Sequence, residues 1–283
     1  MKLTFIVFLT ALAVCAQEGR LLERRYKDGE TLVYRMKATN EGRNYQVVAK
    51  GIVKKAADGG FIEEYAWTNL VFAGAPVNLP PASVEFRQAL SLDPRNPPAV
   101  PNLAIVHPML IGPITDMLTF YADLWLAEKV GNLSKAGDHL YHEHGGPASW
   151  ADGNYVVLGE DSIDFDITLT SIDGNVATLL VRHVPPKKPR IKIPAPWMAD
   201  PVADTPNNWV NVSRNGDKYV AAVGKETFDV EMKISLPDGK ILSGTIDNPV
   251  ITRERDCQDA ALANCGDARP HKILRQIEIT LER

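Results

Sequence analysis

Membrane-spanning segments, basic clusters and common catalytic motifs are missing from most of this sequence. After residue 16, no apolar run approaches the roughly 20 residues that a transmembrane helix needs. The 31 Lys and Arg residues are outnumbered by 35 Asp and Glu and form no block, which makes nucleic acids and anionic membrane surfaces poor partners. No P-loop, dinucleotide-binding fingerprint or G-x-S-x-G nucleophile elbow occurs. We therefore expect no transmembrane segment in the mature chain, no nucleic-acid partner and no enzyme of those classes.

Cysteine is also scarce, and the three that occur divide into two groups. Cys15 lies in the apolar N-terminal segment, whereas Cys257 and Cys265 form an even pair near the other end of the sequence. In an exported protein, such a pair predicts one disulfide that closes a short loop. A redox or metal pair is the alternative, but the spacing is not C-x-x-C and the loop contains no histidine. The pattern favours a structural disulfide.

The first sixteen residues have the layout of a secretory signal peptide. Lys2 precedes an apolar run over 3–14, and the small residues Cys15 and Ala16 follow it. We expect residues 1–16 to be removed and the mature protein to be periplasmic or extracellular. A lipid anchor on Cys15 is the alternative, because the preceding residues loosely resemble a bacterial lipoprotein motif. Val14 departs from the Gly, Ala or Ser which that motif requires before the cysteine.

The main structural pattern is an alternation of apolar and polar residues with a period of two, which is typical of half-buried strands. In 227–236, five apolar side chains share one face, and Pro237-Asp238-Gly239 predicts a turn into 240–247. Tight turns join antiparallel strands. We predict a mainly β fold, an antiparallel curved sheet or half-barrel of about ten to twelve strands. The other strands that we predict are 31–38, 45–54, 60–72, 162–171, 176–184 and 273–281.

One segment follows the period of an α-helix instead. Apolar residues over 110–130 recur at helical spacing, and Gly131 is a suitable end. Asp116, Asp123 and Glu128 fall on the narrower polar side. We predict one amphipathic helix that packs on the concave face of the sheet or across its mouth.

Two proline-rich stretches, near 93–108 and 185–206, flank the middle third of the chain. Proline fixes φ and restricts the preceding residue, so both stretches are expected to be extended and stiff. They divide 17–283 into two sub-sheets, or they are long loops over a single β-rich domain. The spacing is consistent with both arrangements.

The densest group of polar residues contains His139, His142 and His144. On a strand, His142 and His144 point to the same face and could bind one zinc ion, whereas His139 points to the other face. The alternatives are a polar edge strand with exposed imidazoles and an acid–base role. No H-E-x-x-H motif is present. We expect no resident cofactor, with zinc at these histidines as the alternative.

Three of the five tryptophans lie in turn-rich sequence: Trp150, Trp197 and Trp209. Loop aromatics can form a platform for a ligand, because they bring a large contact area at low entropic cost. Asn208 beside Trp209 would add hydrogen bonds. The alternative is that these tryptophans fold back and plug the open end of the sheet.

These features favour a non-catalytic exported protein that binds an apolar or amphipathic ligand, or another envelope protein. The expected layout is similar to that of lipocalin-like and LolA-like carriers, although no motif is shared with them. One alternative is a metal-dependent hydrolase that uses His139, His142 and His144. Another is a purely structural surface protein.

Overall fold

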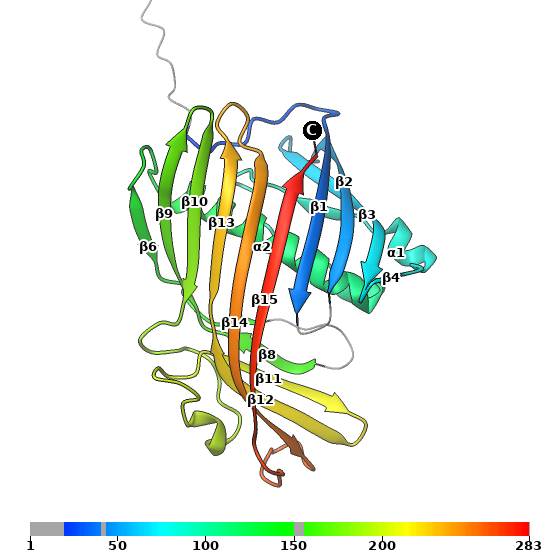
Figure 1. The fold of residues 1–283 in the computed structure, drawn as a ribbon, viewed down its shortest axis with the longest axis vertical. Helices are drawn as coiled ribbons and strands as arrows, with labels where there is room; N and C mark the ends of the chain where they lie inside the picture. Colours follow the sequence, from blue (N-terminus) through cyan, green and yellow to red (C-terminus); the bar gives the residue numbers. More distant parts are fainter. Residues whose placement is uncertain (1–19, 41–43, 150–155, 283) are drawn as a thin grey trace, which may run out of the picture.

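The computed structural model describes residues 20–40, 44–149 and 156–282. The predicted signal peptide over 1–16, the lipid alternative at Cys15, and Trp150 lie outside these residues. The described chain forms one antiparallel sheet with a long helix packed on it (Figure 1). The predicted fold class is confirmed.

The sheet forks along strand β14 (Ile241–Cys257), which pairs with β15 (Arg269–Leu281) over most of its length. Residues 241–247 of β14 pair with β13, whereas residues 250–257 pair with β12. We call the part that contains β13 and β1 the wide sheet, and the part that contains β12 the side sheet. The fork lies at Asn248, whose amide donates to the backbone oxygen of Thr227 at 2.8 Å.

The wide sheet has the order β6-β9-β10-β13-β14-β15-β1-β2-β3, with β4 and β5 paired to β3. Within the described residues its outer strands do not pair with each other, so the sheet curves without closing. Its other strands are β1 (Thr31–Asn40), β2 (Tyr45–Lys55), β3 (Phe61–Phe72), β4 (Ala75–Pro76), β5 (Gln88–Leu90), β6 (His139–His142), β9 (Asp164–Asp173), β10 (Val176–Val184) and β13 (Phe228–Ser235).

The side sheet is smaller and continues from β14 in the order β12-β11-β8-β7. It twists away below the wide sheet in Figure 1. Its strands are β7 (Ala148–Ser149), β8 (Val156–Asp161), β11 (Trp209–Asn215) and β12 (Lys218–Glu226). The remaining elements are the short helix α1 (Pro81–Glu85), the long helix α2 (Pro108–Val130) and the 3-10 turns η1 (Leu103–Ile105) and η2 (Pro196–Ala199).

Helix α2 fills the concave face of the wide sheet. Its inward residues join one hydrophobic cluster with side chains from most of the wide-sheet strands. Gly244 of β14 permits this close packing, because a Cβ atom there would lie 2.6 Å from the ring of Phe120. The side chains of α2 with almost no exposed surface are Leu110, Ile114, Met117, Phe120, Tyr121 and Leu124.

The polar side that the sequence predicts for α2 is buried together with its apolar stripe. Asp116, Asp123 and Glu128 are all buried, with 4%, 2% and 5% of their surface accessible. These acids are buried because strands and loops pack against the polar side of the helix as well as against its apolar stripe.

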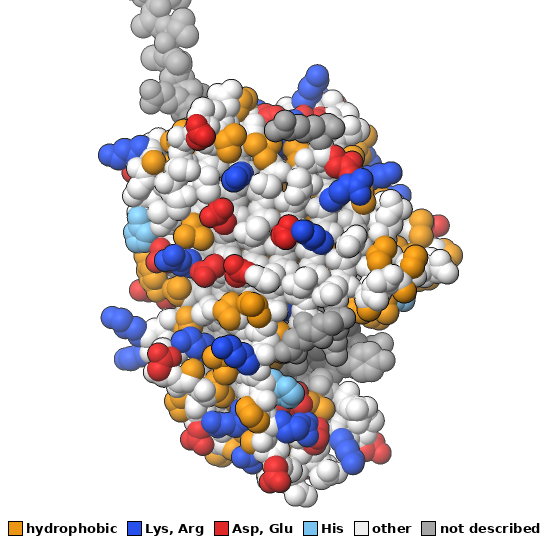
Figure 2. All heavy atoms as spheres, in the orientation of Figure 1, with side chains coloured by type: hydrophobic (Ala, Val, Ile, Leu, Met, Phe, Trp, Pro, Cys, Tyr) orange, Lys and Arg blue, Asp and Glu red, His pale blue; other side chains and the backbone are white. Residues whose placement is uncertain are grey.

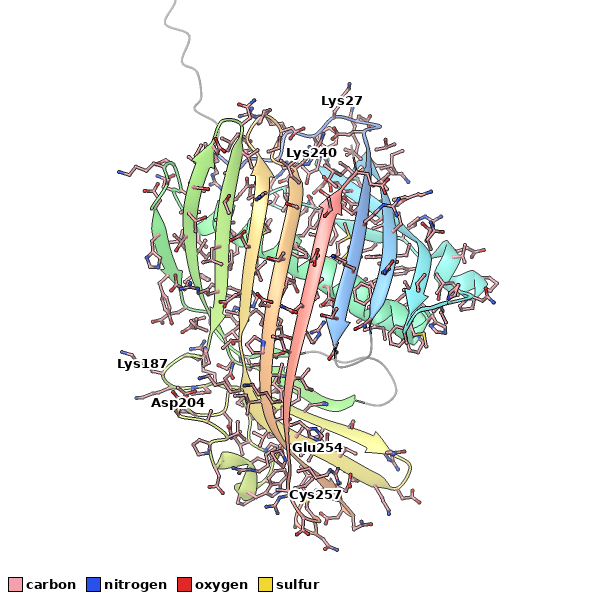
Figure 3. All side chains as sticks on the ribbon, viewed as in Figure 1. Lys27, Lys187, Asp204, Lys240, Glu254 and Cys257 are labelled. Carbon is pink, nitrogen blue, oxygen red and sulfur yellow. A yellow bond between two sulfur atoms is a disulfide. The ribbon has the colours of Figure 1, made fainter. Side chains whose placement is uncertain are left out.

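A second, smaller cluster fills the space between the side sheet and the loop that carries η2. Met198 of η2 packs there with Val210, Val223 and Cys257. The Sγ atoms of Cys257 and Cys265 lie 2.03 Å apart, at disulfide distance, as the sequence predicts. Figure 3 places Cys257 at the lower end of β14. The pair therefore anchors the end of the side sheet.

The outer surface carries charges of both signs. Figure 2 shows Lys and Arg side chains interspersed with Asp and Glu over the outer face of the sheet. Cross-strand pairs such as Lys37–Glu278, at 2.8 Å, are examples. The part of the chain that the structure describes also has no helix of the length and apolar character that spanning a membrane requires.

Candidate functional site

The interface between α2 and the concave face of the wide sheet combines a large apolar area with three buried contacts between polar side chains. We call these contacts the α2 polar interface. Each joins a side chain of α2, namely Asp116, Tyr121 or Asp123, to side chains of the sheet. Because buried polar groups have few alternative partners, these contacts fix where the helix lies.

Asp116 makes the first contact, with a cation and a phenol. Arg275 of β15 donates to its Oδ1 at 2.6 Å, and the hydroxyl of Tyr45 donates to its Oδ2 at 2.8 Å. Arg275 alternates with the buried Ile277 and Ile279, so it belongs to the concave face. The nearby carboxylate of Asp116 raises the pKa of Arg275 further above its ordinary value. The guanidinium of Arg275 therefore stays charged beside this carboxylate.

Asp123 makes the second contact, with His183 of β10. The Nε2 atom of His183 lies 2.8 Å and 2.9 Å from the two carboxylate oxygens. The rings of Phe165 and Phe228 lie 4.8 Å and 4.9 Å from the imidazole and exclude water. Burial disfavours the charge on His183, but the Asp123 carboxylate raises the pKa of His183 above its ordinary value. The geometry therefore favours a protonated imidazole beside an ionised carboxylate.

Tyr121 makes the third contact, with Glu63 of β3. The Tyr121 hydroxyl donates to Oε2 of Glu63, and the Tyr65 hydroxyl donates to the same oxygen at 2.7 Å. Nε of Arg24 donates to the other oxygen, Oε1, at 2.8 Å. Burial and the Glu63 charge raise the pKa of Tyr121 well above its ordinary value, so both phenols stay protonated. Both carboxylate oxygens of Glu63 thus accept hydrogen bonds inside the protein.

A hydrogen-bonded chain leads from Arg275 to Glu226 at the fork, where Asp161 is a second buried acid. Nη1 of Arg275 donates to Asn248 at 3.2 Å, and the Asn248 amide donates to Oε1 of Glu226 at 3.1 Å. Burial, together with the charge of Asp161, raises the pKa of Glu226 to about 7. Burial also raises the pKa of Asp161 to about 6, and its Oδ1 has no hydrogen-bond partner among the described residues. Both carboxyls therefore exchange protons near neutral pH.

Glu128, in the last turn of α2, is a buried acid with incomplete hydrogen bonding. Its Oε1 has no partner in the part of the chain that the structure describes. Burial and the neighbouring Glu23 raise its pKa to about 8. A carboxylate at this end of a helix is also unfavourable for the helix dipole. The C-terminal end of α2 is thus less stable than its apolar contacts alone would make it.

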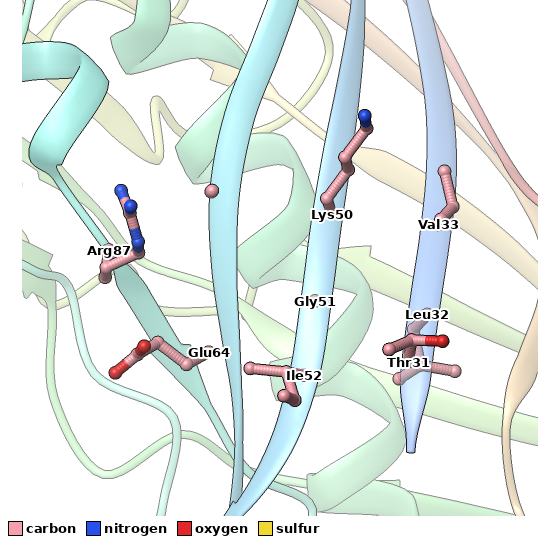
Figure 4. A pocket seen from close by; sticks show the side chains of 9 residues that line it. Thr31, Leu32, Val33, Lys50, Gly51, Ile52, Glu64 and Arg87 are labelled. Atoms are coloured by element: carbon pink, nitrogen blue, oxygen red, sulfur yellow. The ribbon is translucent and has the colours of Figure 1, made fainter. Parts of the chain in front are cut away.

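Two surface hollows lie apart from this interface. The larger, about 340 Å³, opens between β1, β2 and β3, with Lys50, Ile52, Glu64 and Arg87 around it (Figure 4). The smaller, about 180 Å³, lies beside Met198 in the loop that carries η2. Neither is lined by residues of α2. A ligand on the concave face would therefore have to take the place of the helix.

The structure does not gather the three candidate zinc ligands around one point. Nε2 of His139 lies 2.7 Å from Asp166, whereas the rings of His142 and His144 lie 6.4 Å and 6.0 Å from that of Phe165. Over residues 20–40, 44–149 and 156–282, no group of three or more His, Cys, Asp or Glu side chains is arranged to hold a metal ion. His139 contacts a carboxylate, whereas His142 and His144 contact an aromatic ring, so the three imidazoles do not converge on one point.

Of the predicted ligand-binding tryptophans, Trp197 lies in η2 and Trp209 in β11 of the side sheet, whereas Trp150 lies outside the described residues. The indole of Trp197 donates to the backbone oxygen of Leu262 at 3.2 Å, and the guanidinium of Arg255 lies 4.9 Å from the centre of its ring. Trp209 is the first residue of β11 and not part of a turn. Asn208 is fully buried, and its amide donates to the backbone oxygens of Ser162 and Glu226 at 3.1 Å and 3.0 Å. Trp197 and Asn208 therefore hold loops in place.

The sequence contains a signal for the residues that were missed. His183 and Arg275 each occupy an inward position of an alternating strand, where apolar residues are expected. Asp116 and Asp123 are seven residues apart, which places both on one face of a helix. A charge at an inward position predicts a buried partner of opposite sign. Which strand faces which turn of the helix does not follow from the spacing.

Comparison with known proteins does not place the chain in a family. No family model matches the chain, and neither a curated protein nor a solved structure is similar enough to count as a match.

Proposed function

We propose that this protein is an exported, non-catalytic carrier that binds an apolar or amphipathic molecule on the concave face of the wide sheet. The ligand takes the place of α2, which covers that face when no ligand is bound. The observation that carries the proposal is the α2 polar interface, in which an open apolar sheet holds its covering helix partly through buried ion pairs.

The concave face provides the apolar surface that such a ligand needs. Its strands contribute side chains that are almost fully buried under α2, and the sheet does not close behind the helix in the described residues. Apolar area contributes about 25 cal/mol for each Å² removed from water, whether a helix or a ligand covers it. Representative lining residues are Met36, Val47, Leu179, Met232, Ile246 and Ile279.

The polar contacts lower the free-energy difference between a covered and an uncovered sheet. A buried ion pair is often no more stabilising than apolar residues of the same volume, because both charges must leave water. Asp116 and Asp123 regain hydration when α2 moves away, and so does Glu128, which is incompletely paired in the core. The interface is therefore specific in position but less stable than a fully apolar one.

The connections of α2 allow it to move without breaking the sheet. No strand lies between the end of β5 at Leu90 and the start of α2, and residues 131–138 join α2 to β6. The first connection packs Leu92, Leu103 and Val106 into the apolar cluster and is also held by hydrogen bonds. Trp125 of α2 donates to the backbone oxygen of Asp93 at 3.1 Å, and the amide of His107 donates to Ser83 at 2.7 Å.

The test is a titration of the purified protein with the neutral apolar dye N-phenyl-1-naphthylamine, followed by fluorescence. Gly244→Ala is the diagnostic variant, because its closest conflict would be with the ring of Phe120 of α2 at 2.6 Å, ahead of the backbone oxygen of Glu231 at 3.0 Å. We expect saturable binding that is tighter in Gly244→Ala than in the unmodified protein. Gly145→Ala is the matched control, since nothing lies within 4 Å of a Cβ atom there.

Hydrogen exchange of residues 108–130 supplies the second measurement. Bound dye should increase amide exchange in α2 and leave exchange in β14 and β15 unchanged. No dye binding by either protein, or binding with full protection of α2, would show that the helix is a permanent part of the core.

A further inference from the structure

We infer that the ligand is an amphipathic anion, a hydrocarbon chain with a negatively charged head group that pairs with Arg275. This inference rests on the proposed function and adds the charge of the ligand to it. The argument is that α2 supplies the concave face with carboxylates, which the sheet itself lacks at those positions.

Arg275 is the cation that α2 leaves behind. Its Nη2 is paired with Asp116, its Nη1 donates to the neutral amide oxygen of Asn248, and 28% of its side-chain surface is accessible. Tyr45, the other sheet residue in the pair, is a neutral phenol. The guanidinium cannot lose its charge and matches a carboxylate or phosphate with two parallel hydrogen bonds. A bound anion would therefore replace the negative charge and the hydrogen bond that Asp116 provides to Arg275.

The remaining acid near Arg275 does not replace Asp116. Glu226 interacts with Arg275 through Asn248 and not directly. It is also close to the acid Asp161, so a full negative charge on Glu226 is disfavoured near neutral pH. Without α2, Arg275 keeps most of its positive charge uncompensated on an apolar surface.

His183 gives the same face a second cationic position. Its Nε2 contacts Asp123 of α2, and its ring is otherwise enclosed by Phe165 and Phe228. Asp116 and Asp123 are separated by two turns on one face of α2, with Met117 and Phe120 buried between them. The helix thus presents to the sheet a combination of negative charge and hydrocarbon, which is the composition of an anionic amphiphile.

The experiment compares two probes that differ only in head-group charge. These are 11-(dansylamino)undecanoic acid and its methyl ester, titrated near neutral pH against Gly244→Ala. We expect the acid to bind at least about tenfold more tightly than the ester, because only the acid can pair with Arg275.

A double substitution, Asp116→Asn with Arg275→Gln, removes both charges and leaves no buried charge unpaired. In this variant we expect the acid to lose most of its advantage over the ester, with the remaining preference due to His183. Arg182→Gln is the matched control, because Arg182 is adjacent to His183 in β10 but points to the exposed outer face. It should keep the preference for the acid.

Two further outcomes separate this inference from the proposed function. Equal affinity of acid and ester in Gly244→Ala would overturn the inference, while the carrier function would stand. No binding of the neutral naphthylamine dye or of either dansyl probe would overturn both. Displacement of the acid by oleate indicates a free fatty acid as the ligand class, and displacement by phosphatidylglycerol vesicles alone indicates a phospholipid.

Discussion

The wide sheet and the side sheet are held together in different ways, although β14 and β15 run through both. The wide sheet encloses a helix in a large apolar cluster and contains buried ion pairs. The side sheet has a small apolar cluster and relies on a disulfide-linked loop and on asparagines that bind backbone oxygens. A large core can include charges because its apolar burial offsets their desolvation.

This difference in contacts predicts which of the two sheets can change conformation. In the side sheet, Asn207 donates to the backbone of Met198 and Asp200 at 3.0 Å and 2.8 Å, which fixes the η2 loop against the strands. In the wide sheet, α2 has no backbone ladder with any strand, and side chains alone hold it. We therefore expect the wide sheet to carry the conformational change and the side sheet to remain rigid.

Phe120→Ala should have the largest effect on stability. It removes a fully buried ring from the contact between α2 and Gly244, and we expect a loss of about 3–5 kcal/mol in the free energy of unfolding. Chemical denaturation measures it. Ile172→Ala, at an exposed position of β9, should change stability by about 0.5 kcal/mol or less. Similar losses for the two variants would contradict the dominant role of α2 packing.

Replacing both Cys257 and Cys265 with serine should have the next largest effect, confined to the side sheet. The loop that the pair closes has a sequence separation of 8, for which chain entropy gives about 2–3 kcal/mol. Hydrogen exchange should increase in β11 and β12, while α2 keeps its protection. A uniform increase over both sheets would mean that the two parts unfold as one unit.

The pH dependence of stability should come mainly from the buried acids of the wide sheet and the fork. The pKa of Glu128 is raised to about 8, so the folded protein holds a proton there that the unfolded chain releases above about pH 4.5. Stability should therefore fall as the pH rises from about 5 to 8. The raised pKa values of Glu226 and Asp161, about 7 and about 6, act in the same direction.

Glu128→Gln tests this dependence by thermal unfolding at the two ends of that pH range. The variant should raise the melting temperature at pH 8 by about 3 °C, which corresponds to roughly 1 kcal/mol in a domain of this size. At pH 5 the difference should be smaller. Glu231→Gln, on the exposed face of β13, is the control. Parallel pH profiles of Glu128→Gln and the unmodified protein would argue against a raised pKa of Glu128 in the folded protein.

His139→Ala should have the smallest effect. Its pair with Asp166 is exposed to solvent, and such pairs contribute about 0–1 kcal/mol. We expect a small change in the melting temperature and the same zinc content, by elemental analysis, as in the unmodified protein. Loss of bound zinc in the variant would restore the metal-site hypothesis for this segment.

The sequence predicts the repeating elements of this fold better than its tertiary contacts. Alternation identifies β13, and helical spacing identifies α2, because each pattern reflects a local period. The short strands β4 and β7, with two residues each, lack a period and were not predicted. Asp116 and Arg275 are 159 residues apart, and no local pattern indicates that they meet.

Strand β15 has a further consequence for the order in which the chain can assemble. It lies between β1 and β14, so the first strand of the wide sheet is joined to the others by the last. A chain that emerges from the ribosome therefore cannot complete the wide sheet around α2 until residues 269–281 have been synthesised. Until then, β1 and β14 each present an unpaired edge. The wide sheet is thus completed only by its last strand, and truncation before Arg269 should yield aggregation instead of a smaller folded protein.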